Sequence, residues 1–254
     1  MKSDLADSLS ILGTQVGAFD SPDAVLELIR RRIMANERTF CVAINPEKVY
    51  RARHDSRLRN ILESADVRIC DGVGISLAAM LLHRRPLPRC TGIDLFLRLV
   101  QLSVGQGWNV FLLGASPQSN AAACRALMNQ HRGLRIVGNR SGYFKTSAEV
   151  VAEINESQAE LLFVALGSPR QEFWISENMP ALKPVFLMGI GGSLDVVGGM
   201  SKRAPLLFQK TGTEWAFRLL SKPRRLVRQK ALPLFMMDVL KEMIAVRKTR
   251  ASLP

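Results

Sequence analysis

The amino-acid sequence predicts an α/β fold in which helices cover both faces of a parallel sheet and a basic helical appendage follows at the C-terminus. Between Thr39 and Ile190, short apolar runs alternate with longer amphipathic segments. This alternation is typical of strand-helix-strand units, because parallel strands buried on both faces are apolar throughout. The six runs are FCVAIN, VRIC, NVFLLG, LRIVG, ELLFVALG and PVFLMGI.

Helix-start signals occur where this alternation requires helices. Ser21-Pro22, Ser116-Pro117 and Ser168-Pro169 each offer an N-cap side chain followed by proline at the first helical position. The segment from Thr146 to Glu149 has the spacing of a capping box. We therefore expect a helix to begin at each of these four places.

The sequence changes character after Gly199. Apolar strand-like runs cease, and residues 204–221 and 226–248 are typical of two amphipathic helices rich in Lys and Arg. We place a domain boundary near residue 200, with a catalytic-type domain at 1–200 and an appendage at 201–254. The net charge is +13, and 13 Lys or Arg against 3 Asp or Glu give the appendage +10 of it. So basic a segment predicts an anionic partner such as phosphate groups, a lipid surface or nucleic acid.

Length and composition exclude several classes of protein. A chain of 254 residues buries a full core without disulfides. The four cysteines form no CxxC pair, which favours reduced thiols over a disulfide framework or a zinc site. Asp4 and Asp7 interrupt the N-terminus where a signal peptide is apolar, and no apolar run reaches the length of a membrane-spanning helix.

Polar residues just after the apolar runs are the candidate site, since ligands of open parallel sheets bind beyond the carboxyl ends of the strands. Asp71 follows VRIC and precedes Gly72 and Gly74, and its carboxylate is suited to accept a proton from a sugar hydroxyl. The alternative is an N-cap of the following helix. Neither this Gly-x-Gly nor the loop containing Gly191 and Gly192 completes a dinucleotide or P-loop motif.

Two other candidates also have structural alternatives. Asn45 precedes a proline, as in an Asx turn, and Gln171 stands three residues after Ser168, as in a capping box. No Asp-x-Asp pair follows a strand, so the usual carboxylate clamp for a metal-bound sugar diphosphate is missing. We therefore expect no metal and no other cofactor if the protein handles diphosphates.

The appendage carries arginines suited to phosphate. Arg218, Arg225 and Arg228 are spaced for bidentate contacts with phosphate oxygens, and the alternative is a solvated basic face. An apolar stripe accompanies them, which is typical of a helix that lies on an anionic bilayer. The stripe consists of Trp215, Phe217, Leu219, Leu220 and Leu226.

Eight ordered blocks between about residue 40 and residue 228 resemble the WecG/TagA/CpsF glycosyltransferases. They are AINPEK, CDGVGIS, PRCTGIDLF, VFLLGASP, SGYF, ALGSPRQEFW, GIGGSLDVVGGMSKRAP and EWAFRLLSKPRR. The resemblance implies a Rossmann-like core whose appendage closes the active site and meets the membrane. It also implies inverting transfer of a sugar from a UDP donor to a polyprenyl-diphosphate-linked acceptor, in the assembly of bacterial surface polysaccharide.

The resemblance assigns roles to residues of this chain. It places the catalytic base on Asp71 and further catalytic-pocket residues on Asn45, Arg89 and Gln171. The residues expected to bind the donor and its diphosphate are Tyr143, Gly191, Gly192, Asp195, Arg218, Arg225 and Arg228. Ala43 stands where many members have threonine, and resembles the branch that transfers N-acetylmannosaminuronic acid; N-acetylmannosamine and glucose are the other sugars considered.

We accordingly expect a cytoplasmic protein that is peripheral on the inner face of the bacterial cytoplasmic membrane, with homo-oligomers left open. Two alternatives are a nicotinamide-dependent enzyme, weakened by the incomplete glycine motif, and a non-enzymatic binder of anionic membrane or nucleic acid. Nucleic acid is disfavoured as a partner, because few aromatic residues stand among the basic ones.

Overall fold

The computed structural model describes residues 7–211, 213–214, 217 and 231–251. Its strands are β1 (Ser8–Ile11), β2 (Thr14–Gly17), β3 (Thr39–Ile44), β4 (Val67–Cys70), β5 (Asn109–Gly114), β6 (Arg135–Arg140), β7 (Leu161–Ala165) and β8 (Phe186–Gly189). Its helices are α1 (Pro22–Met34), α2 (Pro46–Ala52), α3 (Ser56–Ser64), α4 (Val73–His83), α5 (Gly92–Gln106), α6 (Pro117–Gln130), α7 (Ser147–Glu156), α8 (Arg170–Asn178), α9 (Ser193–Val197), α10 (Leu206–Thr211) and α13 (Ala231–Ala251).

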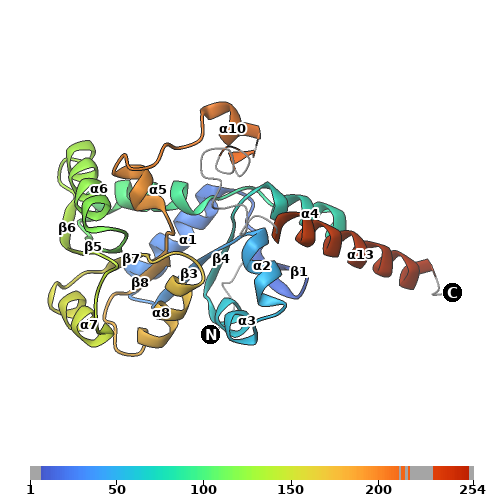
Figure 1. The fold of residues 1–254 in the computed structure, drawn as a ribbon, viewed down its shortest axis with the longest axis horizontal. Coiled ribbons are helices and arrows are strands. Elements are labelled where there is room, and N and C mark those ends of the chain that lie inside the picture. The colour runs from blue at the N-terminus through green and yellow to red at the C-terminus, as the bar shows by residue number, and fades with distance from the viewer. Residues whose placement is uncertain (1–6, 212, 215–216, 218–230, 252–254) are drawn as a thin grey trace.

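Strands β3 to β8 form one parallel sheet in the order β4-β3-β8-β7-β5-β6 (Figure 1). They coincide with the six apolar runs, so the predicted α/β fold is confirmed. All residues of β3, β7 and β8 are buried, which explains why those runs are apolar throughout. Because every strand runs the same way, all six carboxyl ends lie at one edge of the sheet.

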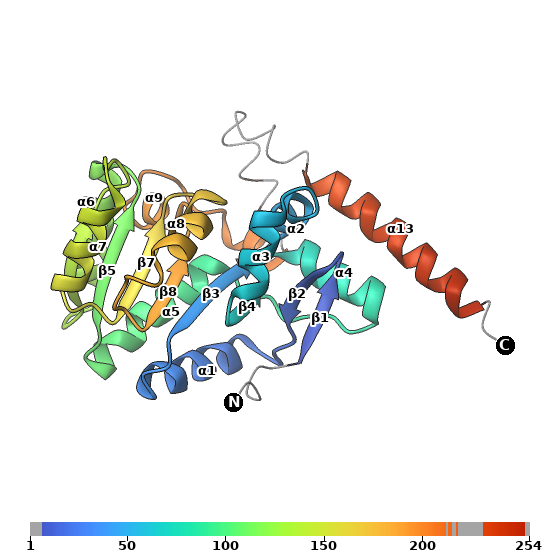
Figure 2. The same ribbon diagram turned by 90° about the horizontal axis from the view of Figure 1, so that it is seen from below.

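Helices lie on both faces of the sheet (Figure 2), and a hydrophobic cluster fills the space between each face and its helices. Along β3, Phe40, Val42 and Ile44 belong to one cluster while Cys41 and Ala43 belong to the other. The first cluster contains side chains of α2, α3, α4, α7, α8 and α13, and the second contains side chains of α1, α5, α6 and α9. The chain therefore leaves β3 and β8 on opposite faces, which opens the sheet edge between them to a ligand.

The helix starts follow the prediction at three sites and differ at one. Ser21 and Ser116 cap α1 and α6 with their side chains. Thr146 occupies the N-cap position of α7 without a side-chain cap bond. The expected start at Ser168 is wrong, because α8 begins at Arg170 with Pro169 at its N-cap position. The antiparallel hairpin β1-β2 was not predicted, since its two four-residue strands carry no long apolar run.

Helix α13 packs against α2 and α4 and extends beyond the sheet (Figure 1). Phe235 and Val239 point into the core and are fully buried. Met237 and Ile244 lie about half a turn away and are exposed, so apolar side chains stand on two sides of this helix rather than on one. This differs from the amphipathic pattern expected of the segment. The division into domains at residue 200 stays a prediction.

Candidate active site

Asp71 and Asn45 lie side by side at the carboxyl ends of neighbouring strands. In the parallel register, Ile44 of β3 faces Cys70 of β4, and Asn45 and Asp71 are the next residues. The backbone N–H of Asp71 also donates to the Ile44 carbonyl at 2.8 Å. The sheet therefore brings together two residues that lie 26 positions apart in the sequence.

Asp71 is half-buried and is not the N-cap residue of α4. That position belongs to Gly72, whose φ of 104° suits glycine, and no side chain caps the helix there. Gly74 serves packing, since a Cβ atom on it would lie 2.6 Å from Pro46 Cγ of α2. The N-cap position that the alternative gave to Asp71 is therefore occupied by Gly72.

Arg89 reaches the same strand end through the segment that precedes α5. The N–H of Cys90 donates to the Cys70 carbonyl at 2.9 Å, so the residues around Arg89 run beside the end of β4. Burial raises the pKa of the Cys70 thiol to about 12, with the charge of Asp71 acting in the same direction and that of Arg89 against it. Cys70 is therefore a neutral core thiol beside a carboxylate and a guanidinium.

Glu214, which follows α10, also meets Arg89. The distance between Arg89 Nη2 and Glu214 Oε1 is 3.5 Å, and the Glu214 side chain is only 11% exposed. A residue beyond position 200 thus lies at the candidate site. Arg218, Arg225 and Arg228, predicted for the same region, lie outside the described residues.

Asn45 caps α2 as well as standing beside Asp71. Its Oδ1 accepts from the N–H of Lys48 at 3.0 Å, and Pro46 takes the first helical position. The expected local turn before the proline is thus the helix cap itself. With its oxygen held by the helix, the amide offers its Nδ2 as the donor for a ligand.

Gln171 does not form the predicted capping box. Its side chain is buried, its Oε1 accepts from the N–H of Gly191 at 2.9 Å, and its Nε2 donates to Glu172 Oε1 at 2.9 Å. A Cβ atom at Gly189 would lie 2.5 Å from this Nε2, so the glycine at the end of β8 makes room for it. Gln171 therefore holds the loop after β8 through its Oε1, while its Nε2 bonds the neighbouring residue Glu172 on α8.

A buried ion pair, which the sequence did not indicate as part of the site, continues this network. Lys48 Nζ lies 2.8 Å from Glu172 Oε1, with side chains 4% and 1% exposed, and donates to the Ala43 carbonyl at 2.7 Å. Burial alone raises the pKa of Glu172, but the charge and hydrogen bond of Lys48 and hydrogen bonds from Gln171 and Ser168 hold it below its ordinary value. The available signal was the presence of Lys48 and Glu172 within the blocks AINPEK and RQEFW, each of which contains one further charged residue.

The residues predicted to bind the donor lie at the ends of the other strands. Gly191 has a φ of 55°, Gly192 is the N-cap residue of α9, and Asp195 stands in the first turn of that helix. Tyr143 is 78% exposed, in the loop after β6 that Gly142 ties to the Ala115 carbonyl. These residues lie at the same edge of the sheet as Asp71 and Asn45, the edge formed by the carboxyl ends of the strands. Tyr143 follows β6, which is at the opposite side of the sheet from β4.

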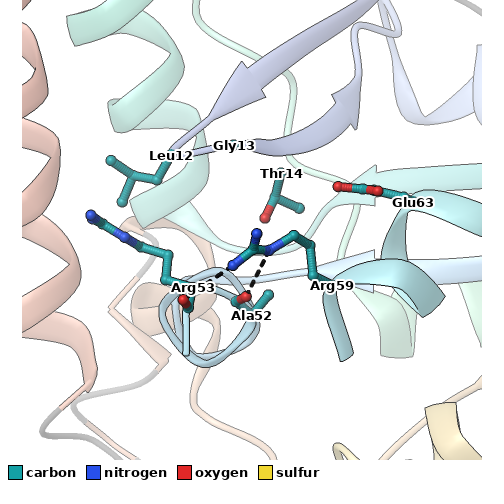
Figure 3. Close-up of a pocket in the computed structure, with 7 residues that line it drawn as sticks. All are labelled: Leu12, Gly13, Thr14, Ala52, Arg53, Arg59 and Glu63. Atoms are coloured by element: carbon teal, nitrogen blue, oxygen red, sulfur yellow. Dashed lines mark hydrogen bonds between the residues drawn. The ribbon is translucent and has the colours of Figure 1, made fainter. Parts of the chain in front are cut away.

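A cavity of about 410 Å³ lies elsewhere, between the β1-β2 turn and the connection of α2 to α3 (Figure 3). Arg59 donates there to the carbonyls of Ala52 and Arg53. Because Ala52 is at the opposite end of α2 from Asn45, this cavity is separate from the strand edge. We assign the candidate site to the edge, where the polar side chains converge.

Within the described ranges, no group of three His, Cys, Asp or Glu side chains gathers in a way that could hold a metal ion. In the same part of the chain, no helix combines the length and the apolar character needed to cross a membrane.

Comparisons with known proteins agree with the resemblance of the eight blocks. The model of the glycosyl transferase WecG/TagA/CpsF family matches residues 9–249. A relative from Bacillus spizizenii is 34% identical over 206 residues, which cover 81% of this chain and 80% of the relative. That relative is named N-acetylglucosaminyldiphosphoundecaprenol N-acetyl-beta-D-mannosaminyltransferase.

Proposed function

The chain belongs to the WecG/TagA/CpsF family of glycosyltransferases, and from this premise we propose that it transfers an N-acetylmannosamine-type sugar from a UDP donor to a polyprenyl-diphosphate-linked saccharide. The name of the Bacillus spizizenii relative supports this sugar and this acceptor class. The convergence of Asp71, Asn45 and Arg89 at one strand edge carries the proposal. Family membership favours this activity over a nicotinamide-dependent reaction or non-enzymatic binding.

Asp71 is the proposed general base. For inversion, the acceptor hydroxyl attacks the anomeric carbon on the face opposite the departing UDP, and a carboxylate on the acceptor side takes its proton as the new bond forms. Asp71 is half-buried and adjoins Asn45, whose Nδ2 can donate to a sugar oxygen. The pair would thus orient and deprotonate the acceptor.

Arginines are proposed to stabilise the leaving diphosphate without a metal. Negative charge builds on UDP as the sugar departs, and fixed guanidinium groups stabilise such charge. Arg89 is held by Glu214 near Asp71, and Arg218, Arg225 and Arg228 follow shortly after Glu214 in the sequence. The contact between Arg89 and Glu214 supports an appendage that completes the site.

The donor can be identified by direct binding and turnover. We expect UDP, but not NAD(H), to raise the melting temperature. In a panel of UDP-N-acetylmannosamine, UDP-N-acetylmannosaminuronate, UDP-glucose and UDP-N-acetylglucosamine, we expect product from the first with an N-acetylglucosaminyl-diphosphate-lipid acceptor. Product from another donor would reassign the sugar, and stabilisation by NAD(H) alone would refute the proposal.

We propose that the protein is peripheral on the inner face of the cytoplasmic membrane, because two neighbouring helices expose apolar side chains. Val73, Leu77 and Met80 form an exposed row on α4 at i, i+4 and i+7. Helix α13, which packs against α4, exposes another apolar row, and the basic composition suits anionic lipid. The residues of that second row are Leu234, Met237, Leu240 and Ile244.

Replacing Leu77 and Met80 by serine is expected to weaken binding to vesicles containing phosphatidylglycerol by about tenfold, since each substitution removes part of a transfer free energy of about 1.5–3 kcal/mol. Vesicle sedimentation measures the effect. Met34→Ser removes a still more exposed apolar side chain, on α1, and serves as the control. Equal binding of both variants would exclude α4 from the membrane contact.

A further inference from the structure

The buried carboxylate of Glu172 fixes which way the Gln171 amide points. A carboxylate accepts hydrogen bonds but donates none, so the Gln171 group facing it must be the Nε2 donor. The Oε1 acceptor then faces the other way, toward the N–H of Gly191. A reversed amide would set oxygen against oxygen on one side and donor against donor on the other.

Lys48, on α2 after β3, holds Glu172 in place. Its Nζ bonds both the Glu172 carboxylate and the Ala43 carbonyl, and its own backbone N–H is capped by Asn45. An unbroken series of contacts therefore runs from Asn45 on the acceptor side to Gly191 on the donor side. Every side chain between them is at least 95% buried, so water does not compete for these bonds.

We propose that Lys48 and Glu172 are positioning residues, which orient the Gln171 amide and thereby set the β8 loop against the acceptor-side residues. Gln171, whose two polar atoms are engaged within the protein, acts through Gly191 rather than by touching the sugar. This inference rests on the proposed function for its effect on the donor. The orientation of the amide itself is independent of any substrate.

A pair of double variants separates positioning from mere stability. In Lys48→Met/Glu172→Met, both charges leave together, which for buried ion pairs often preserves the fold, but Nε2 of Gln171 loses its acceptor. In Lys48→Met/Glu172→Gln, the charges also leave, but an amide oxygen remains to accept. We expect the first variant to bind UDP about tenfold more weakly than wild type, because a tenfold loss of affinity corresponds to roughly one lost hydrogen bond. The second variant should bind UDP nearly as tightly as wild type.

Hydrogen exchange of the Gly191 amide, followed by NMR, provides a readout that needs no substrate. The rate should rise at least tenfold in the Met/Met variant and stay near wild type in the Met/Gln variant. Glu177→Gln removes an exposed carboxylate from α8, the helix that carries Glu172. This carboxylate pairs with Arg57 of α3, and its removal should change neither the exchange rate nor the UDP affinity. If the Met/Met variant does not fold, Gln171→Met, with the ion pair intact, should give the same two losses.

If both double variants fold and show the same Gly191 exchange rate and the same UDP affinity as each other, the positioning role of Lys48 and Glu172 is overturned. A wild-type protein that binds no UDP, yet shows the expected exchange differences, would instead refute the proposed function and leave the orientation of Gln171 established.

Discussion

Asp71→Asn is expected to lower turnover by about 100-fold or more, the contribution of a well-placed general base. The amide keeps the size of the side chain but cannot take a proton from the acceptor. Because Gly72 rather than Asp71 holds the N-cap position of α4, and asparagine matches aspartate in size, the substitution should leave the melting temperature nearly unchanged. UDP affinity should also persist, since the base acts on the acceptor rather than on the nucleotide. Steady-state kinetics with the lipid-linked acceptor measure the effect.

The pH dependence of kcat/KM separates a base from an electrostatic role. A base must be ionised, so wild-type kcat/KM falls on the acid side, and that limb should disappear from the residual activity of Asp71→Asn. Asp55→Asn is the matched control, because Asp55 caps α3 away from the strand edge and asparagine caps equally well. Near-normal turnover of the Asp71 variant would assign the base elsewhere.

The parallel sheet could be predicted from the sequence because its strands are buried on both faces. A run such as ELLFVALG has no other stable environment once amphipathic helices flank it. The hairpin β1-β2 escaped prediction for the opposite reason. Its strands are four residues long and contain polar residues such as Ser10 and Gln15, which a loop would also contain.

The residues of the candidate site could be predicted from the sequence, but the contacts that hold them in place could not. Asp71 and Asn45 could be placed together because both follow parallel strands, and strand order then made them neighbours. Gln171 was found, but its local spacing to Ser168 indicated a cap, whereas its actual partners come from β8 and the next residue. Local spacing cannot show contacts that depend on how separate strand ends are arranged.

Lys48 and Glu172 show the same limit more sharply. Each lies on the first turns of a surface-type helix, where charged residues are ordinarily solvated. Only the packing of α2 and α8 on the same face of the sheet brings them together and excludes water. A charged residue on the first turn of a helix that follows a buried strand can therefore belong to the site even where its helix position indicates contact with solvent.

Lys48→Met alone is expected to destabilise the protein by about 3–5 kcal/mol at neutral pH, because it leaves the Glu172 carboxylate buried without its cation. Urea unfolding at about pH 8 and about pH 5 measures the loss. In wild type, the pKa of Glu172 is held below its ordinary value, so its ionised form contributes stability that is lost only as pH falls through that lowered pKa.

The variant should reverse this dependence. Without Lys48, burial raises the pKa of Glu172 above its unfolded value, so the folded state takes up a proton as pH falls and recovers stability. The difference in the free energy of unfolding between the variant and wild type should therefore be smaller at about pH 5 than at about pH 8. Lys48→Met/Glu172→Met, which has no buried carboxylate at this position, should lack that recovery. A difference in unfolding free energy that stays constant with pH would mean that water or another cation reaches Glu172. The Lys48–Glu172 pair would then not be shielded from other charges and from solvent, as its burial indicates.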